Sequence, residues 1–283
     1  HLADPAMTAC AMEPKAALAQ WDAKTSRFTL VASTQGVMLI RKILAEQVFR
    51  ITPENLRVIT PHVGGGFGVK VQAYAEYAAI LYASRSLGRS VKWTATRLEC
   101  FLTDTHSRNS TLRARMAFDA QGHILALKAD VIVGIGAYTS TFIGIVATNN
   151  IKNCLSSVYQ IPSIKMRSRL VFTHMMPNGP YRGAGRPEAI YMVERLMDRA
   201  ALSMGIDRLD LRRRNLIPPS AMPYAAANGQ VYDSGEFEAV MDKALVLSDW
   251  NGFESRRLGS ESNGKLRGIG ICCFLEVAGG TLE

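Results

Sequence analysis

The sequence predicts an α+β fold in which helices pack against mixed β-sheets, and three observations support this. Strand-like segments fill most of residues 27–172, and helical periodicity takes over in residues 187–247. Glycine-rich loops lie where strands lead into helices. The 283 residues are 48% hydrophobic and 20% charged, which excludes a disordered or collagen-like chain and is enough for about two domains or one large domain.

The first third of the chain contains strands and helices in turn. Residues 27–33 and 56–59 have strand composition, and residues 38–49 carry apolar side chains at helical spacing. The second strand leads directly into the glycines of residues 64–68. A helix follows, and we expect its apolar face to be buried; this face consists of Tyr74, Tyr77, Ala78, Leu81 and Tyr82.

Four further strands are expected at residues 91–94, 111–118, 124–133 and 165–172. The longest uncharged stretch, residues 131–151, has the length of a membrane span. Its Gly, Thr, Ser and Asn residues dilute the apolar signal, so it predicts a buried strand and a loop instead, and we expect no membrane span.

Helices are expected at residues 187–204, 207–214 and 236–247. Arg212, Arg213 and Arg214 are interpreted as a solvated helix end, where positive charge opposes the helix dipole. Residues 251–265 resemble a polar linker, and residues 266–277 a strand. We therefore expect one domain in residues 1–250, with room for two α+β subdomains, and in residues 251–283 a linker and the start of a following, truncated domain.

Charge and cysteine content bear on the partners and the cellular compartment of the protein. Thirty-three Lys and Arg residues against 24 Asp and Glu residues give a net charge of +9, which permits phosphate-bearing partners without identifying one. The five cysteines are scattered, with no Cys-x-x-Cys pair and no histidine at zinc spacing. We expect a reducing compartment and a cytoplasmic location. No initiator Met begins the chain, and we interpret it as a fragment of a longer protein.

The glycine loop, residues 62–70, reads His-Val-Gly-Gly-Gly-Phe-Gly-Val-Lys. It is not a P-loop, because no glycine directly precedes Lys70, and it is not a dinucleotide fingerprint, because Val71 stands where a third glycine is needed. Its glycines predict a backbone that approaches another group closely, with free N–H groups for an anion or an oxo group. The alternative is a tight strand-to-helix turn without a ligand.

The arginine loop, residues 177–188, places Arg182 and Arg186 among small residues just before a helix. It is typical of a cradle for an anionic cofactor, since helix N-termini attract negative charge. The alternative is a turn whose arginines are solvated or pair with Glu188 and Glu194. Upstream, residues 33–36 (Ser-Thr-Gln-Gly) present Gln35 ahead of a helix, which by itself is typical of an N-cap.

These three motifs, in this order and spacing, resemble the large, molybdenum-cofactor-binding subunits of the xanthine dehydrogenase, aldehyde oxidase and carbon monoxide dehydrogenase family. The resemblance begins at residues 12–18, continues through residues 214–216, and corresponds to the first of two molybdopterin-binding halves. Members hydroxylate a carbon centre with water as the oxygen source. The resemblance therefore implies a molybdenum hydroxylase that oxidises an aldehyde, a heterocycle or a CO-like small molecule, with a fold of the molybdenum-cofactor-binding domain type in residues 1–250.

The resemblance also implies residue roles. Gln35 corresponds to a glutamine that hydrogen-bonds an oxo ligand of the metal, the backbone of Gly66, Phe67 and Gly68 lines the cofactor, and Arg182 lies beside it. No residue here is expected to ligate the metal directly. The expected cofactor is molybdopterin with molybdenum, in the cytosine dinucleotide form, with iron–sulfur clusters and FAD on partner subunits or domains of an oligomeric enzyme. The general-base glutamate is expected in the second half, so this chain has no catalytic residue of its own and is expected to be inactive alone.

Four substrate-pocket positions differ from family members of known specificity. Val71 replaces the glutamate, and Asn150 the arginine, that anchor a purine. Gly183 replaces the cysteine that binds copper in carbon monoxide dehydrogenases, and Ala184 stands where a bulky aromatic residue can occur. These residues favour an aldehyde or an N-heterocycle over xanthine and CO. Val69 and Pro180 also depart from the usual Gly and Ala.

Two other functions are open at the level of sequence. The first is a non-catalytic basic module that binds phosphate or nucleic acid, which would need basic residues interleaved with exposed aromatic ones. Because the tyrosines of residues 74–82 are expected to be buried, we expect no nucleic-acid partner. The second is a structural relative that has lost its metal.

Overall fold

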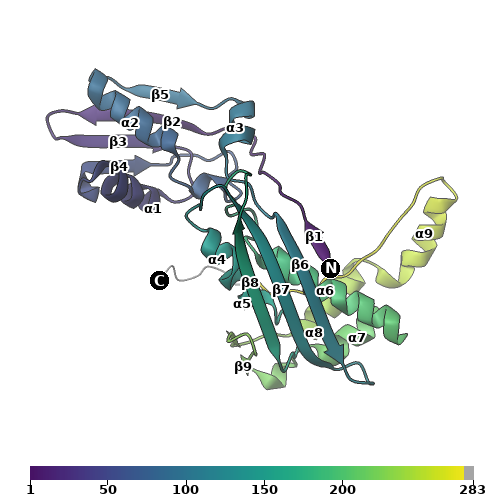
Figure 1. Cartoon of the computed structure of the whole chain (residues 1–283). Coiled ribbons are helices and arrows are strands. Elements are labelled where there is room, and N and C mark those ends of the chain that lie inside the picture. Colours follow the sequence, from purple (N-terminus) through teal and green to yellow (C-terminus); the bar gives the residue numbers. More distant parts are fainter. Residues whose placement is uncertain (277–283) are drawn as a thin grey trace.

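The computed structural model describes residues 1–276, which form two sheet-based units joined side by side (Figure 1). One four-stranded sheet has the strand order β4-β3-β2-β5, the other four-stranded sheet has the order β1-β6-β7-β8, and a small third sheet pairs β9 with β10. Each sheet has its own hydrophobic core. The α+β fold with mixed sheets and packed helices is confirmed.

The first unit contains β2 (Ala16–Asp22), β3 (Arg27–Ala32), β4 (Leu56–Ile59) and β5 (Val91–Thr94). Its helices are α1 (Val37–Lys42), which continues as the π-helix η1 (Ile43–Phe49), and α2 (Ala75–Leu87). Alternate residues of β3 face inward, so that Phe28 and Leu30 are buried against Tyr77 and Leu81 of α2. A short 3₁₀ turn, η2 (Pro53–Asn55), precedes β4.

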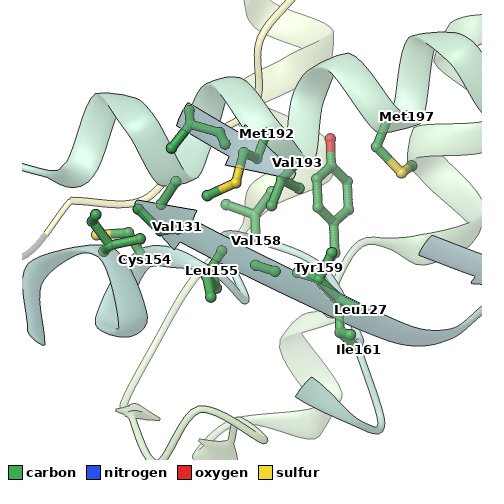
Figure 2. Packing of buried hydrophobic residues seen from close by; sticks show 14 of the residues in the cluster. Leu127, Val131, Cys154, Leu155, Val158, Tyr159, Ile161, Met192, Val193 and Met197 are labelled. Carbon is green, nitrogen blue, oxygen red and sulfur yellow. The ribbon is translucent and has the colours of Figure 1, made fainter. Parts of the chain in front are cut away.

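The second unit contains β1 (Leu2–Asp4), β6 (Ser110–Phe118), β7 (Ile124–Gly136) and β8 (Ile164–Phe172). Helices α6 (Arg186–Met204), α7 (Arg208–Asn215) and α8 (Phe237–Leu247) follow it. Figure 2 shows Leu127 and Val131 of β7 packed beneath Met192 and Val193 of α6, with Tyr159 between the layers. The apolar stripe of α6 thus meets the inward-facing residues of the sheet.

The remaining elements are short. They are α3 (Arg97–Thr103), α4 (Ile143–Ala147), α5 (Asn149–Cys154), α9 (Phe253–Glu261), the strands β9 (Tyr224–Ala225) and β10 (Val231–Tyr232), and the 3₁₀ turns η3 (Val69–Val71), η4 (Pro219–Ala221) and η5 (Trp250–Gly252). None of the helices in residues 1–276 is long and apolar enough to cross a membrane.

A buried ion pair crosses the seam between the two units. Lys15, just before β2, places its Nζ atom 2.7 Å from the Oδ1 atom of Asp104, just after α3. Lys15 is 1% exposed, and its Nζ atom also lies 3.5 Å from the centre of the Tyr74 ring. Tyr74 in turn contacts the second unit, because its hydroxyl accepts a hydrogen bond from the Thr105 amide. Specific polar contacts therefore join the two units at this point.

Four expectations from the sequence need correction. Residues 137–151 do not form only a loop, because α4 and α5 begin there. Tyr82, which is expected from the sequence to be buried, is 59% exposed because it lies on the solvent side of α2. Residues 251–265, which resemble a polar linker in sequence, contain part of η5 and all of α9. Residues 266–276 form no strand, and Val277 lies outside the described residues. Arg212 is not solvated but fully buried, where it pairs with Glu194 and Asp198.

Candidate functional site

The glycine loop adopts backbone conformations that explain its composition. Gly65 has φ = 96° and Gly68 has φ = 100°, a region that residues with a side chain rarely occupy. Phe67, between them, is also left-handed (φ = 53°) and 40% exposed. The loop therefore turns its aromatic ring and its backbone outward. Within residues 1–276, the amides of Gly65, Gly66 and Phe67 donate no hydrogen bond to another group.

Gln35 is fixed against the glycine loop by its carbonyl oxygen. Its Oε1 atom accepts hydrogen bonds from the amides of Gly68 (2.8 Å) and Lys70 (3.2 Å). The backbone amide of Gln35 donates to the carbonyl oxygen of Lys70 (3.0 Å). Gly66 permits this approach, because a Cβ atom there would collide with the Gln35 side chain. Since Oε1 is already engaged and Gln35 is exposed, its Nε2 group has no acceptor within residues 1–276 and is an available donor there.

A carboxylate outside the motif holds the same loop from behind. The Oε2 atom of Glu13 accepts a hydrogen bond from the Gly64 amide (2.6 Å) and lies 2.8 Å from the Nζ atom of Lys70, which is buried. Partial burial acts to raise the pKa of Glu13. The hydrogen bonds from Lys70 and Gly64 outweigh it and hold the pKa of Glu13 below its ordinary value. The charge of Lys70 is thereby compensated inside the loop.

The glycine loop and the arginine loop meet directly. The Arg182 amide donates to the carbonyl oxygen of Phe67 (3.0 Å). A Cβ atom on Gly68 would lie 2.5 Å from the carbonyl oxygen of Pro180, so the two backbones are in contact there. The structure thus brings Gln35, Gly66, Phe67, Gly68 and Arg182 together, although they come from different units. We call this region the loop junction.

The arginine loop is supported by a buried ion pair that the sequence did not reveal. Arg108 donates from Nη1 to Glu188 Oε2 (3.0 Å) and from Nη2 to the carbonyl oxygen of Arg182 (2.8 Å). Arg108 is 9% exposed and Glu188 is 6% exposed. Burial raises the pKa of Glu188, and the positive charge of Arg108 partly offsets this. The pair anchors the loop to the start of α6.

Of the alternative in which the loop arginines are solvated or pair with Glu188 and Glu194, the pairing is wrong, whereas Arg182 is solvent-exposed. Glu188 forms an ion pair with Arg108, and Glu194 forms one with Arg212. Arg186 lies 3.7 Å from Glu276, and Arg182 is exposed and forms no ion pair within residues 1–276. Arg182 is therefore an available cation at the loop junction.

The predicted substrate-pocket residues divide into two groups. Asn150 of α5 donates from Nδ2 to the carbonyl oxygen of Ala184 (2.8 Å), so these two residues lie together, beside Gly183. Gly183 (φ = 88°) and Ala184 (φ = 46°) are both left-handed. Val71 belongs to the other loop, where its Cγ2 atom lies 3.9 Å from the position of a Cβ atom on Gly36. Asn150 is thus committed to holding the arginine loop through its amide nitrogen.

Three residues that shape the loop junction were missed by sequence reasoning, namely Glu13, Lys70 and Arg108. Glu13 and Lys70 stand inside segments that carried the resemblance, but their pairing spans 57 residues. Arg108 has a left-handed backbone (φ = 64°), which no local pattern announces. No group of three or more potential metal-ligating side chains occurs in the part of the chain that the structure describes.

Comparison with known proteins gives one consistent result. Residues 2–216 match the family model described as molybdopterin cofactor-binding domain. The chain is 29% identical over 284 residues to the carbon monoxide dehydrogenase large chain of Hydrogenophaga pseudoflava, covering 99% of this chain and 35% of that protein. It is 30% identical to the 6-hydroxypseudooxynicotine dehydrogenase complex subunit gamma of Paenarthrobacter nicotinovorans, covering 95% of this chain and 34% of that protein.

The fold is also similar to solved structures. Quinoline 2-oxidoreductase from Pseudomonas putida 86 superposes with a TM-score of 0.85 at 30% identity, covering 93% of this chain and 33% of that one. The chain spans about a third of the length of the relatives it matches.

Proposed function

The chain belongs to the family of molybdopterin cofactor-binding domains, and on this premise we propose that its loop junction holds a molybdopterin cofactor with molybdenum in the full-length enzyme. The observation that carries the proposal is that residues with unused donors meet through their backbones and through Gln35 at the loop junction, from two separate units. These donors are the Nε2 group of Gln35, the backbone amides of the glycine loop and the guanidinium of Arg182.

The residues present fit such a group. A molybdopterin cofactor is anionic, and it carries phosphate and oxo oxygens that accept hydrogen bonds. Arg182 supplies positive charge, whereas Gln35 supplies a donor without charge. The nearby carboxylate of Glu13 is neutralised by Lys70 and does not repel an anion. The positive-φ glycines leave the backbone open to close approach.

Each residue then has a defined task. Bound molybdenum cofactor supplies transfer of oxygen from water to a carbon centre together with removal of two electrons. Gln35 orients an oxygen ligand, because its own carbonyl is held by Gly68 and Lys70 and its donor cannot rotate away. Phe67, whose side chain is 40% exposed beside these donors, would contact the bound group. Arg182 holds the anionic part against the arginine loop.

For the substrate, we propose an aldehyde or an N-heterocycle. Val71 offers no hydrogen bond to a purine ring, and Gly183 has no sulfur for copper. Two of the similar proteins carry N-heterocyclic compounds in their names, quinoline and a hydroxylated nicotine derivative, which supports this class. Because another similar protein is named a carbon monoxide dehydrogenase, CO is the competing substrate.

The rest of the enzyme is also part of the proposal. The cofactor is the cytosine dinucleotide form, iron–sulfur clusters and FAD reside on partner subunits or domains, and the assembled enzyme is a cytoplasmic oligomer. The general base lies in the part of the protein beyond this chain. Residues 1–250 act as the first molybdopterin-binding domain, and the chain alone is inactive.

The decisive variant is Gln35→Glu in the full-length enzyme. A carboxylate can still accept the hydrogen bonds of Gly68 and Lys70, so the loop keeps its shape, but the donor becomes a negative oxygen facing the cofactor. We expect molybdenum content per chain, measured by mass spectrometry, to fall severalfold, or kcat to fall about 100-fold where metal is retained. Gln47→Glu, on the exposed side of η1, is the matched control. Full metal content with unchanged kcat in Gln35→Glu would refute the proposed role.

Substrate class is tested separately by steady-state kinetics on quinoline, benzaldehyde, xanthine and CO. We expect turnover of quinoline or benzaldehyde and little of the other two. Val71→Glu should improve the relative kcat/KM for xanthine, because the new carboxylate can hydrogen-bond the purine ring. Efficient CO oxidation by the unmodified enzyme contradicts the substrate assignment but leaves the cofactor assignment intact.

A further inference from the structure

The sheet of the second unit has one covered face and one open face. Helix α6 and its neighbours pack on one side, where Leu127, Ala129 and Val131 of β7 are buried. In Figure 1 these helices pass behind the sheet, and no described element crosses in front of β6, β7 and β8. The open face consists of the alternate residues of these three strands, whose side chains point away from the core.

Register places nine residues of the open face in three rows across the strands. The first row is Arg115, Lys128 and Lys165; the second is Arg113, Asp130 and Arg167; the third is Thr111, Ile132 and Arg169. We call these nine residues the basic face. All six of its cationic residues are exposed, and its single carboxylate, Asp130, is engaged by Arg167 at 2.9 Å. The face therefore carries six positive charges against one negative.

The first row of the basic face places three positive charges next to one another. Arg115, Lys128 and Lys165 are direct cross-strand neighbours, and adjacent strands lie roughly 4.8 Å apart. Like charges directly opposite one another destabilise a sheet, and none of these three side chains forms an ion pair within residues 1–276. An anionic surface placed over the row would convert this repulsion into attraction.

We propose that the basic face docks the acidic surface of a separate protein subunit. Charge complementarity selects an acidic partner, because it would meet six cations. The rows contain no aromatic side chain, which single-stranded nucleic acids use for stacking. Large apolar residues are few within the three rows, where Ile132 is the one example, and the exposed Val171 continues the same face beyond the third row. This composition suits a contact between separately folded surfaces and not an extension of the hydrophobic core.

The inference goes beyond the proposed cofactor function, since no residue of the basic face belongs to the loop junction. A relative that this chain resembles is named as a subunit of a complex, which is compatible with a partner chain. Failure of the docking proposal would leave molybdenum content unchanged, and failure of the cofactor proposal would leave docking unchanged.

The test uses the full-length protein isolated from its native host together with the chains that co-purify with it. Zero-length carbodiimide cross-linking joins a lysine to a carboxylate in direct contact, and peptide mass spectrometry locates the bond. We expect Lys128 or Lys165 to be linked to an Asp or Glu of a different polypeptide. Links only to this polypeptide, or full reactivity of both lysines toward an amine reagent in the complex, would overturn the proposal.

A charge-reversal variant gives the second readout. Lys128→Glu/Lys165→Glu should weaken association with that polypeptide by about tenfold, and the loss should shrink at high salt. Lys92→Glu, on the exposed side of β5 in the other sheet, is the matched control and should associate normally. Equal association of the two variants contradicts the proposal. Binding of a 30-residue single-stranded or duplex DNA through Lys128 and Lys165, with no effect on subunit association, would show nucleic acid to be the partner instead.

Discussion

Arg108 donates a hydrogen bond from Nη2 to the carbonyl oxygen of Arg182, 2.8 Å away across 74 residues of sequence. The same guanidinium binds Glu188 at the start of α6. One buried side chain therefore fixes both ends of the segment that carries Arg182, Gly183 and Ala184. The position of the arginine loop depends on a residue outside every motif that the sequence displays.

Removing this support should destabilise the fold. In Arg108→Met, Glu188 is left buried without its partner, and we expect unfolding free energy to fall by about 3–5 kcal/mol in denaturant titration. The double variant Arg108→Met/Glu188→Gln should recover part of this loss, because no buried charge is then uncompensated. Equal stability of wild type and Arg108→Met would show that the pair does not anchor the loop.

Gly68 should be the least replaceable position of the glycine loop. An alanine there adopts an unfavourable backbone angle, at a cost of about 1–3 kcal/mol, and its Cβ atom meets the Pro180 carbonyl. We expect Gly68→Ala to separate the two loops and to lower the molybdenum content of the full-length protein. Gly88→Ala is the control, since Gly88 is also left-handed but has open space around it. It should cost about 1 kcal/mol and leave the metal content unchanged.

The sequence predicted most strands and helices, because their side chains alternate or recur with the period of the element. It missed β2 (Ala16–Asp22), whose sequence Ala-Ala-Leu-Ala-Gln-Trp-Asp has no β-branched residue. This segment becomes a strand because β3 and β5 pair with it on both sides. Tertiary pairing overrides weak local propensity there.

The loop junction was partly predictable. Gln35, the residues around Phe67, and Arg182 were found because each stands in a local motif. Arg108, Glu13 and the burial of Arg212 were not, since each depends on a partner that lies far away along the chain or on a neighbouring helix. A run of three arginines has the composition of a solvated helix end, and only the fold shows that Glu194 and Asp198 pair with one of them.

Adjacent arginines of α7 should therefore behave very differently. Arg212 is fully buried, with Nη2 2.9 Å from Glu194 and 3.0 Å from Asp198, and Tyr159 donates to the same Glu194. Arg212→Met should lower the unfolding free energy by about 3–5 kcal/mol. Arg213 pairs with Asp242 at the surface, so Arg213→Met should change the unfolding free energy by less than about 1 kcal/mol. Thermal and denaturant unfolding of both variants provide the comparison.

The Glu13–Lys70 contact should make stability depend on pH in the acid range. The pKa of Glu13 is lowered in the folded state, so its ionised form contributes stability that is fully present above its ordinary value of 4.5. This contribution is lost as pH falls below 4.5 through the folded pKa. Glu13→Gln should therefore have a lower Tm than wild type at pH 7, with the difference narrowing toward pH 3. A constant difference across this range would mean that the charge of Glu13 plays no part.

The loop junction takes one wall from each of two units that have separate hydrophobic cores, and Lys15 and Asp104 join those units through a buried contact. A ligand that touches both walls acts as a clamp, and by mass action it adds about 2.7 kcal/mol to their association at a hundredfold excess over its Kd. The linkage is reciprocal. Any substitution that loosens Lys15 from Asp104 raises the ligand concentration needed for half-saturation, even though neither residue belongs to the loop junction.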